Sequence, residues 1–158
     1  MIRGNQGLTV VETLLVLLLL GIAARLALPK FDSVLRETTL DGAVAWLLGD
    51  IRYAQSLAIR TQQTCTIAFD TVNESYRLLD QNGAVVQHPL TRQSYQINLK
   101  TMSQFQGLDI VSATFGASST LSFGTLGAPQ TGGTVTLSYA NRQRLLNVIY
   151  PSGRIAVQ

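Results

Sequence analysis

The chain begins with a long apolar run that contains a single carboxylate. Across residues 8–24, Glu12 is the only charged residue, and residues 1–7 form a short polar leader. At 1.5 Å per residue in a helix, this run is barely long enough to cross a hydrocarbon core of about 30 Å, and residues 26–28 make it adequate. A carboxylate in mid-bilayer costs about 2.5–3.5 kcal/mol and usually has a partner. Any assignment of this segment therefore has to account for Glu12.

Two common kinds of N-terminal segment fit this run poorly. A cleaved secretory signal peptide needs small residues at its cleavage site, but Arg25 and Leu26 occupy the place where that site would fall. An ordinary transmembrane anchor fits the length, with the Arg25 side chain extending toward the interface. That assignment leaves Glu12 without a partner.

The residues around Glu12 resemble the processing site of type IV pilins and pseudopilins. Gly7 is followed by Leu8-Thr9-Val10-Val11-Glu12, which is similar to the site that prepilin peptidase cleaves, although Leu8 stands where Phe is more usual. The resemblance implies cleavage between Gly7 and Leu8, N-methylation of Leu8, and pairing of Glu12 with the amine of an adjacent subunit. It also implies that the helix bends at Pro29, because pilin helices commonly bend there.

Electrostatics supports this resemblance. The new α-amine of Leu8 and the carboxylate of Glu12 would each be costly in lipid, and pairing them within a subunit or between neighbours removes most of that cost. The resemblance implies as partners prepilin peptidase, other pilin or pseudopilin subunits, and a secretion or pilus assembly platform. It places the chain in the bacterial inner membrane as a single-pass protein. The head domain would lie in the periplasm or outside the membrane, and the chain would be incorporated into a filament.

The segment after the apolar run has the pattern of an amphipathic helix. Pro29 removes a backbone donor and clashes with the preceding turn, which independently predicts a kink. Beyond it, charged residues fall mostly off a stripe of apolar residues at helical spacing: Leu40, Ala43, Leu47, Ile51, Ala54 and Ala58. We therefore predict a transmembrane or filament-core helix over residues 8–28. An amphipathic helix over residues 29–63 would continue it and pack on a sheet, with Trp46 in that packing.

From Thr64 onward the apolar residues alternate, which is typical of strands. Asn82-Gly83 is a strong hairpin signal, and residues 124–133 read as a loop rich in Gly, Pro and Thr. The expected strands span residues 64–69, 76–79, 84–87, 95–100, 108–114, 120–123, 134–139, 145–150 and 154–157. The fold class is therefore α+β: a long N-terminal helix packed on an antiparallel β-sheet head domain over residues 64–158, as in pilins.

Several segments of the helix and head resemble GspH/FimT-like proteins. They are Leu57-Ala58-Ile59-Arg60, Leu121-Ser122-Phe123-Gly124-Thr125-Leu126-Gly127, Gly132-Gly133-Thr134-Val135-Thr136-Leu137 and Asn147-Val148-Ile149-Tyr150-Pro151-Ser152-Gly153-Arg154-Ile155. In family members that bind DNA, a second Arg follows the Gly-Arg pair after one residue. Here Ala156 stands at that position.

The sequence offers no constellation for catalysis. His88 is the only histidine and lies beside Pro89 in an expected surface loop, while Cys65, the only cysteine, lies in an expected strand as a small buried hydrophobe. One His and one Cys cannot build a typical structural zinc site, and the glycines match no phosphate-binding fingerprint. We therefore expect a non-enzymatic protein without metal or cofactor.

The charge distribution leaves two classes of function open. Net charge is +3, and Arg142, Arg144 and Arg154 follow the last acidic residue, Asp109. The first hypothesis is an assembly protein, a minor pilin or pseudopilin that supports filament initiation and protein secretion. The second is a membrane-anchored binding module for DNA uptake, in which the three arginines contact phosphates without reading sequence.

Overall fold

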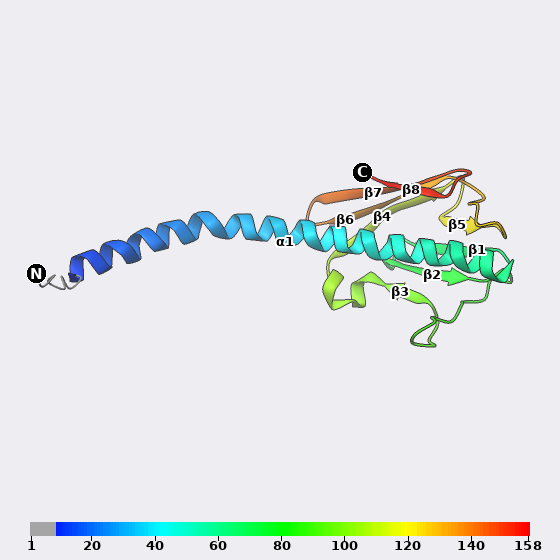
Figure 1. The fold of residues 1–158 in the computed structure, drawn as a ribbon, viewed down its shortest axis with the longest axis horizontal. Helices are drawn as coiled ribbons and strands as arrows, with labels where there is room; N and C mark the ends of the chain where they lie inside the picture. Colours follow the sequence, from blue (N-terminus) through cyan, green and yellow to red (C-terminus); the bar gives the residue numbers. More distant parts are fainter. Residues whose placement is uncertain (1–8) are drawn as a thin grey trace, which may run out of the picture. The chain divides into compact units, whose positions relative to one another are not determined.

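A computed structural model describes residues 9–158, except for the side chains of residues 26–33. Its first element is the helix α1, Val10–Thr61 (Figure 1). Thr9 caps the start, because its Oγ1 accepts a hydrogen bond from the Glu12 N–H at 3.3 Å. The helix ends where Gln62 adopts a left-handed conformation, with φ of 55°.

Helix α1 continues through Pro29. The side chains around this residue lie outside the described part, so a bend at Pro29 stays a prediction. Among the residues that the structure describes, no helical stretch is both long and apolar enough to cross a membrane. The predicted span of residues 8–28 includes Leu8 and the side chains of residues 26–28, which lie outside that part.

The strands form two antiparallel four-stranded sheets (Figure 1). The first sheet has the order β3-β2-β1-β5, built from β1 (Cys65–Asp70), β2 (Ser75–Leu79), β3 (Gln96–Asn98) and β5 (Thr120–Phe123). The second has the order β4-β6-β7-β8, built from β4 (Leu108–Phe115), β6 (Gly133–Tyr139), β7 (Arg142–Ile149) and β8 (Arg154–Val157). Ile67 of β1 stands opposite Leu78 on one side and Leu121 on the other. The predicted α+β fold is confirmed, with two sheets in place of one.

Three expected strands differ from the prediction, and one of them, expected over residues 145–150, begins earlier as β7, Arg142–Ile149. Residues 84–87 form isolated bridges and not a continuous strand. Val86 donates its N–H to the Leu78 carbonyl, while its own carbonyl accepts the Tyr95 N–H, so the segment pairs with a different neighbour on each side. The end of the expected strand 95–100 becomes the 3₁₀ turn η1, Leu99–Thr101. The Asn98 side chain accepts from the Lys100 N–H at 3.0 Å and closes this turn. A second turn, η2, spans Ser103–Phe105.

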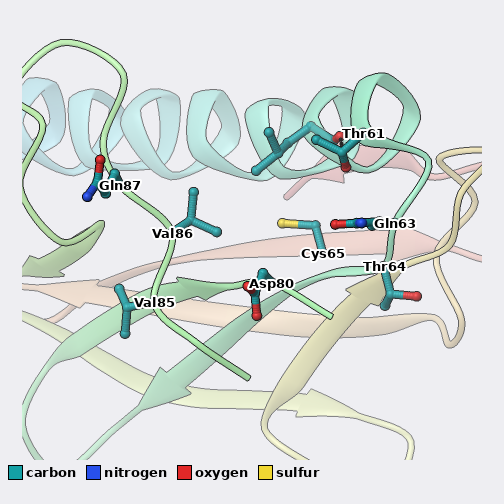
Figure 2. Close-up of a pocket in the computed structure, with 9 residues that line it drawn as sticks. Thr61, Gln63, Thr64, Cys65, Asp80, Val85, Val86 and Gln87 are labelled. Atoms are coloured by element: carbon teal, nitrogen blue, oxygen red, sulfur yellow. Dashed lines mark hydrogen bonds between the residues drawn. The ribbon is translucent and has the colours of Figure 1, made fainter. Parts of the chain in front are cut away.

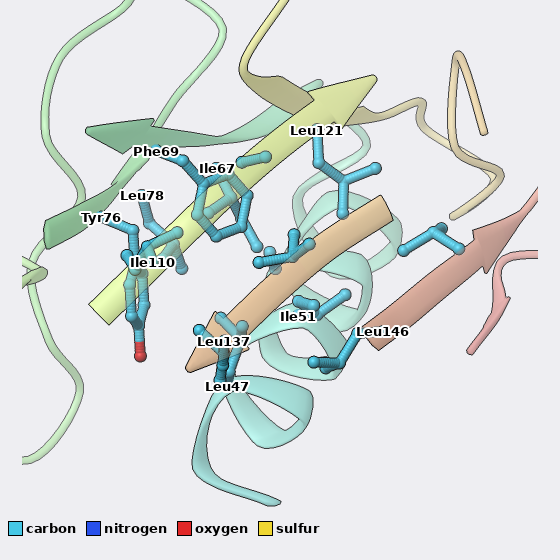
Figure 3. Packing of buried hydrophobic residues seen from close by; sticks show 14 of the residues in the cluster. Leu47, Ile51, Ile67, Phe69, Tyr76, Leu78, Ile110, Leu121, Leu137 and Leu146 are labelled. Atoms are coloured by element: carbon cyan, nitrogen blue, oxygen red, sulfur yellow. The ribbon is translucent and has the colours of Figure 1, made fainter. Parts of the chain in front are cut away.

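The hydrophobic core lies between α1 and the two sheets. The predicted stripe of Leu40, Ala43, Leu47, Ile51, Ala54 and Ala58 is buried, which confirms the helical period. Leu47 and Ile51 belong to the same core cluster as side chains from strands of both sheets, among them Leu78, Leu137 and Leu146 (Figure 3). Full burial of one such side chain contributes about 1.5–3 kcal/mol, so the stripe holds the head together.

A glycine of β6 permits close approach of the neighbouring strand. A Cβ on Gly133 would lie 2.1 Å from the carbonyl oxygen of Thr114 and 2.7 Å from the Cα of Phe115, both in the backbone of β4. A Cβ on Gly124 would meet only the Ala128 carbonyl, at an ordinary 3.8 Å. Neither glycine has a positive φ, so the two positions differ in the space available.

We expect the Gly133→Ala variant to lose about 3 kcal/mol or more of unfolding free energy, because backbone atoms have to shift. Gly124→Ala serves as the control and should stay within about 1 kcal/mol of the parent. Urea unfolding of the full chain in mild detergent, followed by the fluorescence of Trp46, measures both. Equal effects of the two substitutions would contradict the close packing of β4 and β6.

Candidate functional site

The front of α1 carries apolar side chains on every face. Ten large ones are between 46% and 75% exposed: Val10, Val11, Leu14, Leu15, Val16, Leu17, Leu18, Leu19, Leu20 and Ile22. Because residues 14–20 are consecutive and each turns about 100° from the last, no polar face interrupts them. A helix that is hydrophobic all round is covered by lipid or by other helices. This segment belongs to the compact unit that ends at Arg36.

Glu12 lies in the first turn of this apolar segment. Its N–H is capped by Thr9, and its carboxylate is placed favourably near the positive end of the helix dipole. The carboxylate forms no ion pair with any residue in the described part of the chain. Gly7 and Leu8, the predicted cleavage pair, lie outside the described residues.

Two of the three arginines proposed for DNA contact pair with acids of α1. Arg142 Nη1 lies 3.0 Å from Glu37 Oε2, Arg144 Nη2 lies 3.2 Å from Glu37 Oε1, and Arg144 Nε lies 3.0 Å from Asp41 Oδ1. The positive charge of Arg142 and Arg144 is therefore balanced by acids more than one hundred positions earlier in the chain. The charges within the last third of the sequence could not reveal these partners. Such partly exposed pairs contribute about 0.2–1 kcal/mol each. Arg154 is exposed on β8.

The structure buries one acid that the sequence pattern placed off the apolar stripe. Asp50 is only 9% exposed, and it accepts hydrogen bonds from the hydroxyls of Tyr76 at 2.5 Å and Tyr95 at 2.9 Å. Burial raises its pKa above the ordinary 3.8, while the two tyrosine hydrogen bonds and the electrostatic interaction with His88 oppose that rise. The helical step from Leu47 to Asp50 is the signal that could have placed this acid on the inner face.

Tyr95 joins Asp50 to the residues around His88. Its ring stacks on Tyr53 with centroids 5.4 Å apart and packs against His88 at 4.6 Å. His88 is half-buried in the loop between β2 and β3, and its Nδ1 accepts the N–H groups of Leu90 and Thr91, each at 3.3 Å. Desolvation of the Tyr95 hydroxyl and the nearby Asp50 charge raise the pKa of Tyr95.

The remaining side chains singled out in the sequence, Cys65 and Trp46, take part in packing. Cys65 is buried, as predicted, and burial raises the pKa of its thiol to about 11, which keeps it protonated and unreactive. Trp46 is 41% exposed and packs edge-on against Phe105, with ring centroids 6.1 Å apart. Within the described residues, no group of His, Cys, Asp and Glu is arranged to hold a metal ion.

Two of the segments that carry the GspH/FimT resemblance meet at the helix. Gln55 Nε2 donates a hydrogen bond to the Gly127 carbonyl at 2.7 Å. A Cβ on Gly153 would lie 2.7 Å from the same nitrogen, and φ at this glycine is +68°. The glycines of these segments therefore let the two loops close on Gln55, which is a packing role.

We expect Asp50→Asn to remove a pH dependence of stability. When folding raises the pKa of a carboxyl group, the group contributes its full amount to the free energy of unfolding below its unfolded-state pKa. This contribution is lost as the pH rises through the folded-state pKa. The parent should therefore lose stability relative to Asp50→Asn from about pH 4 upward, by at most about 1.4 kcal/mol per pH unit. Urea unfolding at several pH values tests this, with the exposed Asp109→Asn as control. A difference between parent and Asp50→Asn that does not change with pH would contradict the assignment.

The fold resembles solved minor pilin and pseudopilin structures. The minor pseudopilin EpsH of the Vibrio cholerae type 2 secretion system matches with a TM-score of 0.56 and 13% identity, over 75% of this chain and 95% of EpsH. The type IV minor pilin FimU of Pseudomonas aeruginosa matches with a TM-score of 0.54 and 17% identity, over 77% of this chain and 90% of FimU. No curated protein sequence matches the chain.

The sequence itself matches a protein family over most of the helix-and-sheet unit. Residues 43–153 match the family described as type II transport protein GspH, whose members are structural and non-enzymatic, so the prediction of a non-enzymatic protein is confirmed. This match covers more than half of the 158 residues, and the chain belongs to the GspH family of type II transport proteins.

Proposed function

We propose that the chain is a minor subunit of a type II secretion pseudopilus or a type IV pilus, and that it supports filament initiation and protein secretion. The observation that carries this proposal is the front of α1, where ten large apolar side chains stand exposed around a helix that has one carboxylate in its first turn. Family membership and the likeness to EpsH and FimU support it.

Burial of the apolar front favours association of the helix with lipid or with neighbouring helices. It does not fix the axial position of one subunit relative to the next. Covering each half-exposed side chain is worth on the order of 1 kcal/mol relative to water. Lipid tails cover these side chains as well as neighbouring helices do, so apolar contact alone does not select one axial position. A polar pair in the same segment does, because a misplaced carboxylate in an apolar surrounding has no partner.

In this proposal, processing creates the partner of Glu12. Prepilin peptidase cleaves between Gly7 and Leu8, and the α-amine of Leu8 becomes methylated. That amine pairs with Glu12 of an adjacent subunit, and the pair sets the register of the filament. Before assembly the segment is an anchor in the inner membrane, and afterwards it is part of the filament core. The two sheets form a head in the periplasm or outside the membrane that contacts other subunits and the assembly platform.

DNA uptake is the alternative function, and the observed contacts do not favour it. Arg142 and Arg144 would have to exchange Glu37 and Asp41 for phosphates, and Ala156 stands where DNA-binding members have Arg. DNA contact by Arg142, Arg144 and Arg154 stays a prediction.

We expect Glu12→Ala to reach the membrane normally and to enter filaments about tenfold less or worse, because the amine of the neighbouring subunit loses its counter-charge. Glu12→Asp retains the carboxylate and should recover part of the assembly. The measurement compares the amount of each variant in the membrane fraction with the amount in sheared filaments. Normal incorporation of Glu12→Ala would remove the proposed role of Glu12.

A further inference from the structure

Two depressions adjoin near the C-terminal end of α1, beside the loop that joins β2 and β3. Their volumes are about 300 and 370 Å³, and Leu57, Val86 and Gln87 line both. We call the combined surface the helix-end groove. It lies outside the apolar front of α1 and outside the Arg142–Glu37 and Arg144–Asp41 pairs.

One half of the helix-end groove is largely apolar. Leu57 and Val86 line it together with the buried Cys65, and Figure 2 shows the Val86 side chain and the Cys65 sulfur pointing into the space beneath the helix. Asp80 also lines this half, but its Oδ1 already accepts the N–H groups of Asn82 at 2.8 Å and Ala84 at 2.9 Å. An apolar side chain of a ligand fits this half.

The other half carries positive charge without a counter-ion. Arg60 and Arg92 both line it, and neither forms an ion pair with any residue that the structure describes. Arg142 and Arg144, in contrast, are paired with carboxylates. Two unpaired guanidinium groups beside one depression favour a carboxylate or another oxyanion, which guanidinium binds through parallel hydrogen bonds.

The wall of this half is held in place by the buried acid. Tyr53 and His88 line the groove, and both pack on Tyr95, whose hydroxyl is bonded to Asp50. Because His88 Nδ1 accepts two backbone N–H groups, the neutral ring carries its proton on Nε2. The ring therefore offers one further donor to an anion.

Gln87 lines both halves, and its backbone forms an edge that no other described segment of the chain uses. Gln87 and Ser94 stand opposite each other, but the hydrogen bonds of this bridge are made by their neighbours. The Tyr95 N–H donates to the Val86 carbonyl, and the His88 N–H donates to the Gln93 carbonyl, each at 2.7 Å. The N–H and C=O of Gln87 face away from Ser94 and form no hydrogen bond within the described part of the chain. An extended peptide can pair with such an edge, whereas a phosphate ion would leave the apolar half empty.

We propose that the helix-end groove binds an extended acidic segment of a partner protein. A carboxylate of the segment lies between Arg60 and Arg92, a neighbouring apolar side chain enters the half lined by Leu57 and Val86, and the segment backbone pairs with Gln87. The site does not depend on the filament role proposed above, because it shares no residue with Gly7, Leu8 or Glu12.

The test measures binding of fluorescent peptides to the full chain in mild detergent by anisotropy. The probe is a pool of heptapeptides in which valine, leucine or isoleucine alternates with glutamate or aspartate. Its twin pool carries glutamine and asparagine in place of the acids. We expect the acidic pool to bind about tenfold more tightly or better, which is the size of one charge-assisted interaction.

Two variants and a matched control locate the site. Arg60→Gln and Arg92→Gln should each weaken binding of the acidic pool several-fold, while Arg52→Gln should not, because Arg52 is an exposed residue of the same helix outside both depressions. The fluorescence of Trp46 confirms that each variant is folded. Equal binding of the two pools, no binding of the acidic pool, or an equal loss in Arg52→Gln would each overturn the proposal. Binding of inorganic phosphate without binding of the acidic pool would also overturn it, and would identify a plain anion site.

Discussion

The packing of one helical stripe against two sheets is the contact on which the head depends. Leu47 and Ile51 are almost fully buried in a core that also contains side chains of both sheets. Losing a buried Leu or Ile side chain costs about 2–5 kcal/mol in a well-packed core, a large part of the stability of an ordinary domain. The Glu37 and Asp41 ion pairs and the Gln55 hydrogen bond then join the same helix to β7 and to the loop after β5.

Asp50 gives this packing a polar centre. The acid receives two tyrosine hydroxyls, so it ties α1 to β2 and to the loop that carries His88. Burial opposes its charge, as the raised pKa shows, and the hydrogen bonds offset only part of that cost. The same contacts order Tyr53 and His88 beside Arg60 and Arg92, which form no ion pair among the described residues. Asp50 and its two tyrosine partners therefore fix the position of the loop between β2 and β3 and the shape of the helix-end groove beside it.

Periodicity in the sequence was sufficient for most of the fold. The stripe of α1 and most strands follow from spacing, because a helix and a half-buried strand each impose one period on their apolar residues. Spacing could not show that the strands divide into two sheets, or that Val86 bridges Leu78 and Tyr95, since these depend on pairing between distant segments. For the same reason the partners of Arg142 and Arg144, and the burial of Asp50, came only from the structure.

The apolar front of α1 has the opposite character to the stripe, because its side chains are exposed on every face. We propose that processing after Gly7 turns this front into an assembly segment by creating an amine for Glu12. Intact-mass and N-terminal peptide mass spectrometry of the chain purified from its native membranes can show whether this processing occurs. We expect a chain that begins at Leu8 with a methylated amine. A chain that retains residues 1–7, or that begins at a different residue, would contradict it.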